Sequence, residues 1–297
     1  MKKQQLQSNL MLLAAAAIWG FAFVAQRVGA QFIGPFTFNG IRFALGGLSL
    51  LPIILIKNRT PKEKYLITSE LPKAILPGML TGTILFIGAT LQQTGMEFTT
   101  AGKAAFITGL YIALVPIFGL FIGQRTGSST WAGVALAAIG LYFLSINQNF
   151  NIEYGDLIEI IGAFFWATHI LLIDHFIKKV DALLISIVQV VTCSILSIVA
   201  AVIFEDISIL GISQAIIPIL YGGICSVGIA YTLQVVGQKH AKPSHAAIIL
   251  SMESVFASLG GIIILRENLG GRGYLGCLLM LSGMLLSQFS NIRKSKA

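Results

Sequence analysis

The sequence repeats itself at an offset of 142 positions, and this repetition limits the folds that are open to the chain. Thr90-Leu91-Gln92 followed by Gly95 returns as Thr232-Leu233-Gln234 followed by Gly237. Other matched pairs are Lys103-Ala104-Ala105 with His245-Ala246-Ala247, Ala74-Ile75-Leu76-Pro77 with Ala215-Ile216-Ile217-Pro218, Trp19 with Trp166, and Gly133 and Gly140 with Gly276 and Gly283. The chain is therefore a tandem duplication, with one copy in residues 1–147 and the other in residues 148–297.

Long apolar runs follow one another through both copies. Hydrophobic residues make up 56% of the chain and charged residues only 11%, a composition that suits a lipid bilayer as solvent. Each run is close to the roughly 20 residues that cross the hydrocarbon core. The runs cover residues 9–28, 36–56, 72–91, 103–122, 129–146, 155–176, 183–204, 214–236, 244–265 and 272–289. We predict an all-α membrane protein with ten transmembrane helices, and a charged loop between Lys57 and Leu71.

The repeat and the charges together predict the orientation of the chain. Each copy has five spans, and an odd number of crossings leaves the chain on the opposite side of the membrane. The second copy is therefore expected to have the inverted orientation, as in alternating-access transporters. Most Lys and Arg residues fall at the N-terminus, in the even-numbered loops or in the C-terminal tail, which share one side. The positive-inside rule makes this side cytoplasmic, so both termini are expected inside the cell. The net charge of +8 then reflects topology and does not indicate nucleic-acid binding.

Glu253 is the most informative polar residue, because it lies about ten residues into the ninth span and so near the bilayer midplane. An acid at this depth costs about 2.5–3.5 kcal/mol on insertion scales. It is either a group that takes up and releases a proton during transport or a structural carboxylate that is neutral or paired. The repeat alignment places Tyr111 opposite Glu253 at the same depth. We predict that the two residues form the floor of a binding site.

Four basic side chains are further candidates for contact with a ligand. Arg42 lies about two turns into the second span, where it binds a carboxylate, closes an outer gate or bonds to carbonyls of a neighbouring helix. Lys103 and His245 are symmetry mates at the starts of the fourth and ninth spans, and they either reach a ligand or extend to the lipid headgroups. His169 in the sixth span is a proton acceptor, the partner of Glu253 or a hydrogen-bonded core residue.

Two symmetric pairs and one proline complete the set of candidates. Trp19 and Trp166 lie away from the interfacial belts where tryptophan usually collects, so they line a cavity for an amphipathic or cationic metabolite or simply pack. Gln92 and Gln234, near the ends of the third and eighth spans, act either as gates or as interhelical hydrogen bonds. Pro116 removes a backbone bond within the fourth span and marks a hinge or a static bend.

Four runs of residues resemble the EamA family of the drug/metabolite transporter superfamily. They are Ile18-Trp19-Gly20-Phe21-Ala22-Phe23, Gly34-Pro35-Phe36 through Ile41-Arg42-Phe43, Lys103-Ala104-Ala105-Phe106-Ile107-Thr108 through Val115-Pro116, and Ser251-Met252-Glu253-Ser254-Val255-Phe256 ending in Arg266-Glu267. The resemblance covers almost the whole chain. It implies ten helices in two inverted repeats, a central cavity lined mainly by the first, third, fourth, sixth, eighth and ninth helices, and often export of amino acids or other small metabolites. The chain departs from the family at Gln124-Arg125, where an acid is common, and at Ser254, where proline is usual.

These observations predict a secondary-active permease or exporter of small metabolites such as amino acids, alternating around a midplane cavity and coupled to protons through Glu253. No Walker-type phosphate loop is present, so a solute or proton gradient is expected to drive transport. One alternative is a carrier of anionic phosphorylated or nucleotide-linked sugars, with Lys103 and Arg42 clamping the negative group. A further alternative is a non-transporting scaffold or an intramembrane enzyme.

The sequence gives no sign of enzymatic chemistry. It has no His-Glu-x-x-His run and no nucleophile elbow, and Cys193, Cys225 and Cys277 lie far apart inside apolar spans. We therefore expect no cofactor and no metal site. The expected partners are a small-molecule substrate and the lipid bilayer of the cell membrane, and the protein is expected to be a monomer or a homodimer.

Overall fold

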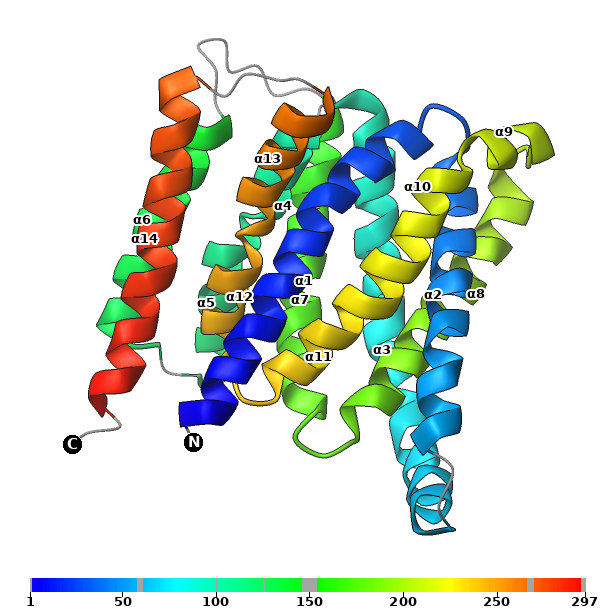
Figure 1. Cartoon of the computed structure of the whole chain (residues 1–297), viewed down its shortest axis with the longest axis horizontal. Coiled ribbons are helices and arrows are strands. Elements are labelled where there is room, and N and C mark those ends of the chain that lie inside the picture. Colours follow the sequence, from blue (N-terminus) through cyan, green and yellow to red (C-terminus); the bar gives the residue numbers. More distant parts are fainter. Residues whose placement is uncertain are drawn as a thin grey trace.

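The computed structural model describes residues 2–57, 61–99, 101–124, 126–145, 154–265 and 270–294, and all regular structure in these residues is helical. The elements are α1 (Lys2–Gly29), α2 (Pro35–Lys57), α3 (Pro61–Phe98), α4 (Ala101–Thr108), α5 (Tyr111–Phe121), α6 (Ser128–Ser145), α7 (Tyr154–Phe176), α8 (Ala182–Phe204), α9 (Ile209–Gln214), α10 (Ile216–Leu220), the π-helix η1 (Tyr221–Tyr231), α11 (Thr232–Gln238), α12 (Pro243–Leu250), α13 (Glu253–Leu265) and α14 (Gly270–Lys294). The long helices form one bundle, and α1 begins at the same end of the bundle at which α14 ends (Figure 1).

Seven helical stretches of the described residues are long and apolar enough to cross a membrane. They are Gln4–Gly29, Ser69–Phe98, Ala104–Phe121, Tyr154–Phe176, Ala182–Phe204, Ile216–Gln238 and Pro243–Ile264. Two shorter apolar stretches are Ser128–Phe143 and Gly270–Leu286. Many large apolar side chains on these helices point outward, among them Ile195, Val202 and Leu278, as expected where lipid replaces water. The fold is that of a multi-pass membrane protein.

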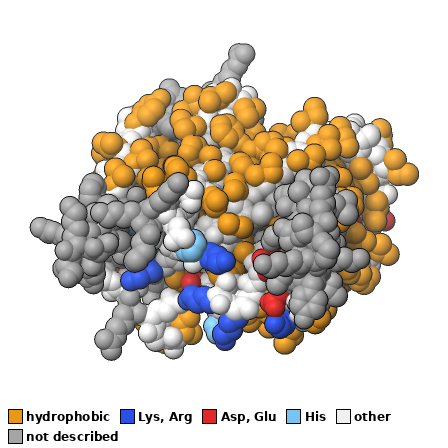
Figure 2. Space-filling view, turned by 60° about the horizontal axis from the view of Figure 1, so that its bottom comes forward, with side chains coloured by type: hydrophobic (Ala, Val, Ile, Leu, Met, Phe, Trp, Pro, Cys, Tyr) orange, Lys and Arg blue, Asp and Glu red, His pale blue; other side chains and the backbone are white. Residues whose placement is uncertain are grey.

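Charged side chains gather at the end of the bundle where α1 begins. Figure 2 turns this end toward the viewer and shows Lys, Arg, Asp, Glu and His side chains grouped together, with hydrophobic side chains covering the flank above them. The short connections between α7 and α8 and between α11 and α12 lie at this end (Figure 1). Their exposed basic residues are Lys178, Lys179, Lys239 and Lys242.

Two helices begin at an acidic side chain that binds free backbone N–H groups. Asp181 precedes α8 and accepts hydrogen bonds from the N–H groups of Leu183 and Leu184 at 3.0 and 3.2 Å. Glu205, just after α8, reaches across to α2 and accepts from the backbone N–H groups of Phe36 at 2.7 Å and Thr37 at 2.8 Å. A carboxylate at this position satisfies unpaired donors and complements the positive end of the helix dipole. Glu205 therefore ties the start of α2 to the end of α8.

The fourth and ninth predicted spans are each broken in the middle, and the breaks match. The first lies at Gly109 and Leu110, between α4 and α5, and the second lies at Ser251 and Met252, between α12 and α13. The two breaks are 142 positions apart, which is the offset of the repeat. At both breaks, backbone N–H groups such as those of Leu110 and Met252 bond to the carbonyl three residues earlier, as in a 3₁₀-helix, whereas an α-helix uses the carbonyl four residues earlier. Both stretches still have the length of the predicted spans, since they cover Ala104–Phe121 and Pro243–Ile264. Gly109 has a low helix propensity, and the Ser251 hydroxyl donates to the Ile248 carbonyl oxygen, so both residues favour an interruption of the α-helical pattern.

One expectation needs correction, and one predicted span has an unexpected helix type. The segment from Lys57 to Leu71 was expected to be a loop, but α3 already begins at Pro61 and runs to Phe98. Proline suits this first position, since its missing N–H has no partner in the first turn of a helix. The predicted eighth span over 214–236 consists of α10, the π-helix η1 and α11, and it ends at Gln238. The backbone hydrogen bonds of a π-helix join residues i and i+5, so η1 has more residues per turn than an α-helix.

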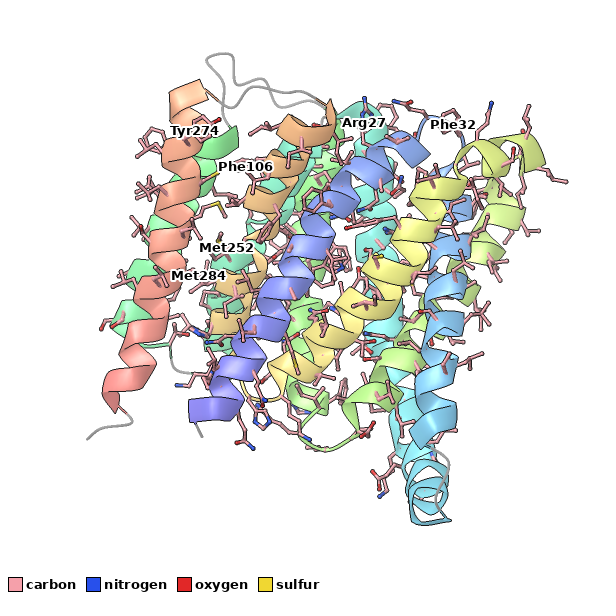
Figure 3. The ribbon with its side chains drawn as sticks, viewed as in Figure 1. Arg27, Phe32, Phe106, Met252, Tyr274 and Met284 are labelled. Carbon is pink, nitrogen blue, oxygen red and sulfur yellow. The ribbon has the colours of Figure 1, made fainter. Side chains whose placement is uncertain are left out.

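Glycines let α6 and α14 pack backbone to backbone, and the contact is reciprocal. A Cβ atom at Gly140 on α6 would lie 2.7 Å from the Gly276 carbonyl oxygen, and one at Gly283 on α14 would lie 2.6 Å from the Gly133 carbonyl oxygen. The repeat alignment matches the same four glycines, as Gly133 with Gly276 and Gly140 with Gly283, so the repeat relates one contact to the other. The α6–α14 pair stands at one edge of the bundle (Figure 1), and Met252 and Met284 lie between this pair and the other helices (Figure 3).

Candidate functional site

A cavity lies among α1, α2, α3, α7, η1 and the two broken helices. Its lining is aromatic and apolar, with a small number of polar side chains, which is the usual character of a small-molecule site. The lining residues are Trp19, Phe23, Gln26, Arg42, Gln92, Thr108, Tyr111, Trp166, Ile170, Ser226, Tyr231, Gln234, Leu250 and Glu253. The cavity is small: its volume of ≈ 30 Å³ has room for about two water molecules.

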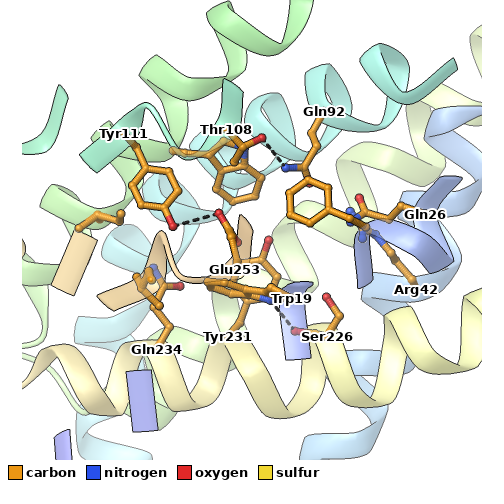
Figure 4. Close-up of a pocket in the computed structure, with 14 residues that line it drawn as sticks. Trp19, Gln26, Arg42, Gln92, Thr108, Tyr111, Ser226, Tyr231, Gln234 and Glu253 are labelled. Carbon is orange, nitrogen blue, oxygen red and sulfur yellow. Dashed lines mark hydrogen bonds between the residues drawn. The ribbon is translucent and has the colours of Figure 1, made fainter. Parts of the chain in front are cut away.

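Tyr111 and Glu253 meet at the two helix breaks. Tyr111 is the first residue of α5 and Glu253 is the first residue of α13. The Tyr111 hydroxyl donates a hydrogen bond of 2.9 Å to Glu253 Oε1, and both side chains are buried (Figure 4). The structure thus brings together the two residues that the repeat alignment places opposite each other. That they form the floor of a binding site stays a prediction.

The neighbouring Ser254 helps to hold the two breaks against each other. Its hydroxyl donates a hydrogen bond of 2.7 Å to the Ala105 carbonyl oxygen of α4. A Cβ atom at Gly109 would lie 3.1 Å from Ser254 Oγ, so the absence of a side chain at Gly109 lets α4 and α13 approach. The serine that departs from the family pattern therefore makes a contact between the two copies that proline lacks the hydroxyl to make.

Arg42 brings a buried positive charge to the cavity. Its Nε donates to the Asn39 Oδ1 atom at 2.9 Å, and its guanidinium carbon lies 5.3 Å from the ring centre of Phe38 and 5.1 Å from that of Phe43. These cation–π contacts hold the planar group in place. In the described part of the chain, no carboxylate forms an ion pair with Arg42. The guanidinium fork is therefore available to bind an anionic group.

Three aromatic rings form one wall of the cavity. The ring centre of Tyr231 lies 4.8 Å from that of Trp19 and 6.4 Å from that of Trp166, and the second pair is stacked. Trp19 Nε1 donates to the Ser226 carbonyl oxygen at 3.2 Å, whereas the buried Nε1 of Trp166 has no partner among the described atoms. The two tryptophans are sequence-equivalent, but only Trp166 keeps a free donor.

Two glutamines extend the polar part of the lining. Gln92 Nε2 donates to Thr108 Oγ1 at 3.1 Å and so joins α3 to α4. Its symmetry mate Gln234 also lines the cavity, and its buried Oε1 has no partner among the described atoms. One amide is thus committed to an interhelical hydrogen bond, and the other has an unused acceptor.

Three of the remaining sequence candidates, His169, His245 and Pro116, lie outside the cavity lining. His169 is fully buried behind Trp166 and Tyr231, and its Nε2 hydrogen-bonds to Gln189 Oε1 at 2.9 Å. His245 is buried in the first turn of α12. Pro116 lies inside α5, beyond the helix break. Lys103 belongs to α4, but its side chain lies outside the described residues, as do Arg125, Arg266 and Glu267.

Sequence reasoning did not single out several residues of the site. Among the lining residues these are Thr108, Gln26, Ser226 and Tyr231. Hydroxyls, amides and a tyrosine in an apolar run carry little signal, because each of them occurs as often in ordinary helix packing. A buried acid beside the cavity, Glu159, also went unnoticed. No group of three or more His, Cys, Asp or Glu side chains that is suited to a metal occurs in the described residues.

Comparison with known proteins decides the family. Residues 6–146 and 153–289 match the EamA-like transporter family, so the match takes in both copies of the duplication. The chain belongs to this family. The resemblance drawn from the four sequence runs is thereby confirmed.

Similar proteins carry transporter names. An uncharacterized transporter of Archaeoglobus fulgidus is 31% identical over 95% of this chain and 86% of its own length. The uncharacterized transporter YoaV of Bacillus subtilis is 24% identical over 96% of this chain and 98% of its own. The uncharacterized inner membrane transporter YedA of Escherichia coli is 26% identical over 52% of this chain and 49% of its own. The protein is therefore a membrane transporter of the EamA-like family.

A solved structure supports the fold. One crystal structure aligns with a TM-score of 0.78 over 96% of this chain and 98% of its own chain, at 18% sequence identity. At this identity the likeness concerns the fold alone. The path of the helices in this EamA-like transporter thus agrees with that of an experimentally determined protein.

Proposed function

We propose that this EamA-like transporter is a secondary-active permease or exporter of small metabolites that carry both an amino and a carboxylate group, such as amino acids. One observation carries the proposal: Arg42, which is buried and has no ion-pair partner among the described residues, and the buried acid Glu253 line the same aromatic-walled cavity. Figure 4 shows Arg42 and Tyr111 at opposite sides of the view, with Glu253 between them. The cavity thus offers separate places for a negative and a positive group.

The chemistry of each place fits one end of such a substrate. A guanidinium pairs with a carboxylate through two parallel hydrogen bonds, and Arg42 is held by the rings of Phe38 and Phe43 in a fixed position. An ammonium group is attracted by a carboxylate and by aromatic faces, which Glu253, Trp19 and Tyr231 supply. The apolar remainder of the substrate would lie against Ile170 and Leu250.

The proposed membrane arrangement is ten helices in two inverted five-helix repeats, residues 1–147 and 148–297, that form one transmembrane domain. Support comes from the matching helix breaks, from the reciprocal contacts of α6 and α14, and from α1 beginning where α14 ends. Exposed basic side chains at that same end favour a cytoplasmic location for both termini and a place in the cell membrane.

Alternating access around the cavity is the proposed mechanism. The cavity in this conformation has room for about two water molecules, so a metabolite enters only when the lining helices move apart. The two breaks beside Tyr111 and Glu253 are places where half-helices can change direction. Proton uptake and release by Glu253, as its surroundings change between the two states, would couple the gradient to transport.

The alternative substrate class is an anionic phosphorylated or nucleotide-linked sugar. The unpaired guanidinium of Arg42 favours any anion, and Lys103 would supply the second positive charge. The buried acid Glu253 argues against this class, because a phosphate would be repelled by it. A non-transporting scaffold would have no need of a cavity with opposite charges, and the family match and the transporter names of its relatives favour transport over an intramembrane enzyme.

Ligand-dependent thermal stability of the purified protein tests the proposal. The panel contains amino acids, their decarboxylated amines, purines, sugars and phosphate esters, applied to the wild type and to Arg42→Gln and Glu253→Gln. A ligand at 100 times its Kd adds about 2.7 kcal/mol of stability. We expect amino acids to stabilise the wild type and neither variant, and the amines to have a much weaker effect. Stabilisation by phosphate esters alone would contradict the proposal, and flux of the selected ligand through reconstituted vesicles separates a transporter from a scaffold.

A further inference from the structure

Glu159 is a second buried acid close to the cavity, and no role has yet been assigned to it. It lies on α7, five residues after the helix begins at Tyr154, and its side chain is completely buried. Its Oε2 accepts a hydrogen bond of 3.3 Å from Thr108 Oγ1, while its Oε1 has no partner among the described atoms. A buried carboxyl oxygen without a partner is costly, so its retention calls for a physical reason.

Helix packing does not supply that reason, as the other copy of the repeat demonstrates. Glu159 lies seven residues before Trp166, and the residue seven before Trp19 is Leu12. A Cβ atom at Gly95 would lie 2.7 Å from Glu159 Cγ, and a Cβ atom at its repeat mate Gly237 would lie 3.0 Å from Leu12 Cγ. The same glycine niche is therefore filled by an acid in one copy and by a leucine in the other. A leucine suffices for packing, so the acid serves another purpose.

Hydrogen bonds connect Glu159 to the cavity. Gln92 Nε2 donates to Thr108 Oγ1 at 3.1 Å, and Thr108 Oγ1 donates to Glu159 Oε2. Gln92 and Thr108 both line the cavity. Thr108 therefore hydrogen-bonds both to Gln92 in the cavity lining and to this acid, and its hydroxyl can accept and donate in turn.

On its other side Glu159 leads toward the end of the bundle where α7 begins. Asp156 lies one turn earlier on the same helix, and its Oδ1 accepts from Thr99 Oγ1 at 2.7 Å. Thr99 directly follows α3, whose last residue is Phe98. Figure 1 shows this end of α7 opposite the end where α1 begins. Thr99, Asp156, Glu159 and Thr108 thus form a line of polar side chains from that end of the bundle to the cavity, and Leu12 interrupts the corresponding line in the other copy.

Among the described residues, the charged groups that act on Glu159 are the acids Asp156 on α7 and Glu253 on α13. Other titratable groups on the helices packed against α7 include Tyr111 on α5, His245 on α12, Glu97 at the end of α3 and Lys103 on α4, whose side chain lies outside the described residues. No described basic side chain forms an ion pair with Glu159. Binding a proton is the way in which such a site is neutralised.

We propose that Glu159 is a second proton-carrying site, which exchanges protons with the cavity through Thr108 and with the aqueous phase past Asp156. As a step of a transport cycle it rests on the proposed function. In the transfer toward the cavity, the Glu159 carboxylic acid gives its proton to the Thr108 oxygen, and that hydroxyl releases its own proton to a cavity water. The water passes one proton to the Glu253 carboxylate, so Glu159 ends ionised, Glu253 ends protonated, and threonine and water are unchanged.

Reaction with dicyclohexylcarbodiimide tests this proposal without any substrate, because the reagent modifies protonated carboxyl groups in apolar surroundings. Membranes that contain the wild type, Glu253→Gln or Thr108→Val are treated from about pH 5 to pH 9, and mass spectrometry locates the modified residue. We expect modification at Glu159 in the wild type and in Glu253→Gln that falls as the pH rises. Thr108→Val removes the hydroxyl that hydrogen-bonds to Glu159, so it should change the pH dependence of the modification of Glu159. Absence of modification at Glu159 beside a modified Glu253, or modification that is equal at every pH, would overturn the proposal.

Two variants separate this inference from the proposed function. Glu159→Leu installs the residue of the other copy, and Glu159→Gln keeps the hydrogen-bond acceptor for Thr108. We expect both to fold and to keep ligand-induced stabilisation, while the pH dependence of flux is lost. An unchanged pH dependence in Glu159→Leu refutes the role of Glu159 and leaves the transporter proposal standing. If Glu159 titrates but no amino acid is bound or moved, the substrate proposal fails, and the protonation site remains.

Discussion

The Tyr111 hydroxyl donates a 2.9 Å hydrogen bond to Glu253 Oε1, and the two residues are 142 positions apart, so each occupies the place of the other in its copy of the repeat. Each is also the first residue of the second half of a broken helix. A carboxylate at the start of α13 is favoured by the helix dipole. A ligand that replaces this hydrogen bond would contact the first residue of both α5 and α13, and would therefore bind next to both helix breaks.

Removing the Tyr111 hydroxyl is expected to destabilise the protein. Tyr111→Phe leaves Glu253 Oε1 buried without its donor, which costs about 1–3 kcal/mol. The measurement is thermal unfolding in detergent. In a Glu253→Met background the same change should cost much less, because the acceptor is already gone. Equal effects in both backgrounds would show that the hydrogen bond contributes little.

Replacing Arg42 is expected to weaken the binding of carboxylate ligands. Hydrogen bonds to charged groups contribute about 1.5–3 kcal/mol, which is roughly 10- to 150-fold in affinity. Arg42→Lys keeps the charge but loses the planar fork, so we expect a large loss in this variant as well. Lys178→Gln removes a positive charge from an exposed site and serves as the control. Equal ligand-induced shifts in Arg42→Lys and the wild type would show that only the charge matters.

The two tryptophans are expected to respond differently to the same change. Trp19→Phe breaks the hydrogen bond to the Ser226 carbonyl and should lower the stability by about 1 kcal/mol. Trp166→Phe breaks no hydrogen bond between described atoms, so its effect should be seen mainly in ligand affinity. Unfolding and ligand titration of the two variants check this contrast. The reverse pattern would mean that the free donor of Trp166 has no role in binding.

The close contact of α6 and α14 predicts intolerance of larger residues. Gly283→Ala places a Cβ atom 2.6 Å from the Gly133 carbonyl oxygen, and such overpacking costs about 1–3 kcal/mol. Gly271→Ala on the same helix meets no atom within 4 Å and should be neutral or slightly stabilising. Thermal unfolding of the two variants gives the comparison. A neutral Gly283→Ala would mean that the helices separate easily.

The tie between α2 and α8 depends on the charge of Glu205. Glu205→Gln keeps the shape but removes the negative charge that faces the start of α2, and we expect a loss of about 1 kcal/mol. Asp206→Asn changes the adjacent exposed acid and is the matched control. Unfolding at low and high salt measures both. A larger effect for Asp206→Asn would contradict the capping role.

The relation between Tyr111 and Glu253 was predictable, because a duplication carries the register of one copy into the other. The same register matches the helix breaks and the glycines of α6 and α14. The breaks themselves were not expected, because the apolar residues continue through them. A change from i to i−4 to i to i−3 hydrogen bonds does not alter the hydropathy pattern.

Other parts of the site depend on contacts that the sequence does not encode locally. Ser226 and Tyr231 reach the cavity from η1, where the π-helical twist changes which side chains share a face. Glu159 lies near the end of a span, where an acid usually reaches water. Its burial depends on the niche at Gly95 of α3, and therefore on tertiary packing.

The reciprocal glycine contact of α6 and α14 has the form of an isologous interface, in which each surface meets its own copy across a twofold axis. Gly140 meets the backbone at Gly276, and Gly283 meets the backbone at Gly133. In the proposed arrangement of two five-helix repeats, this contact is the one that two separate chains would make in a homodimer. A single chain differs from a homodimer in that its two copies can carry different residues at matched places, such as Leu12 and Glu159.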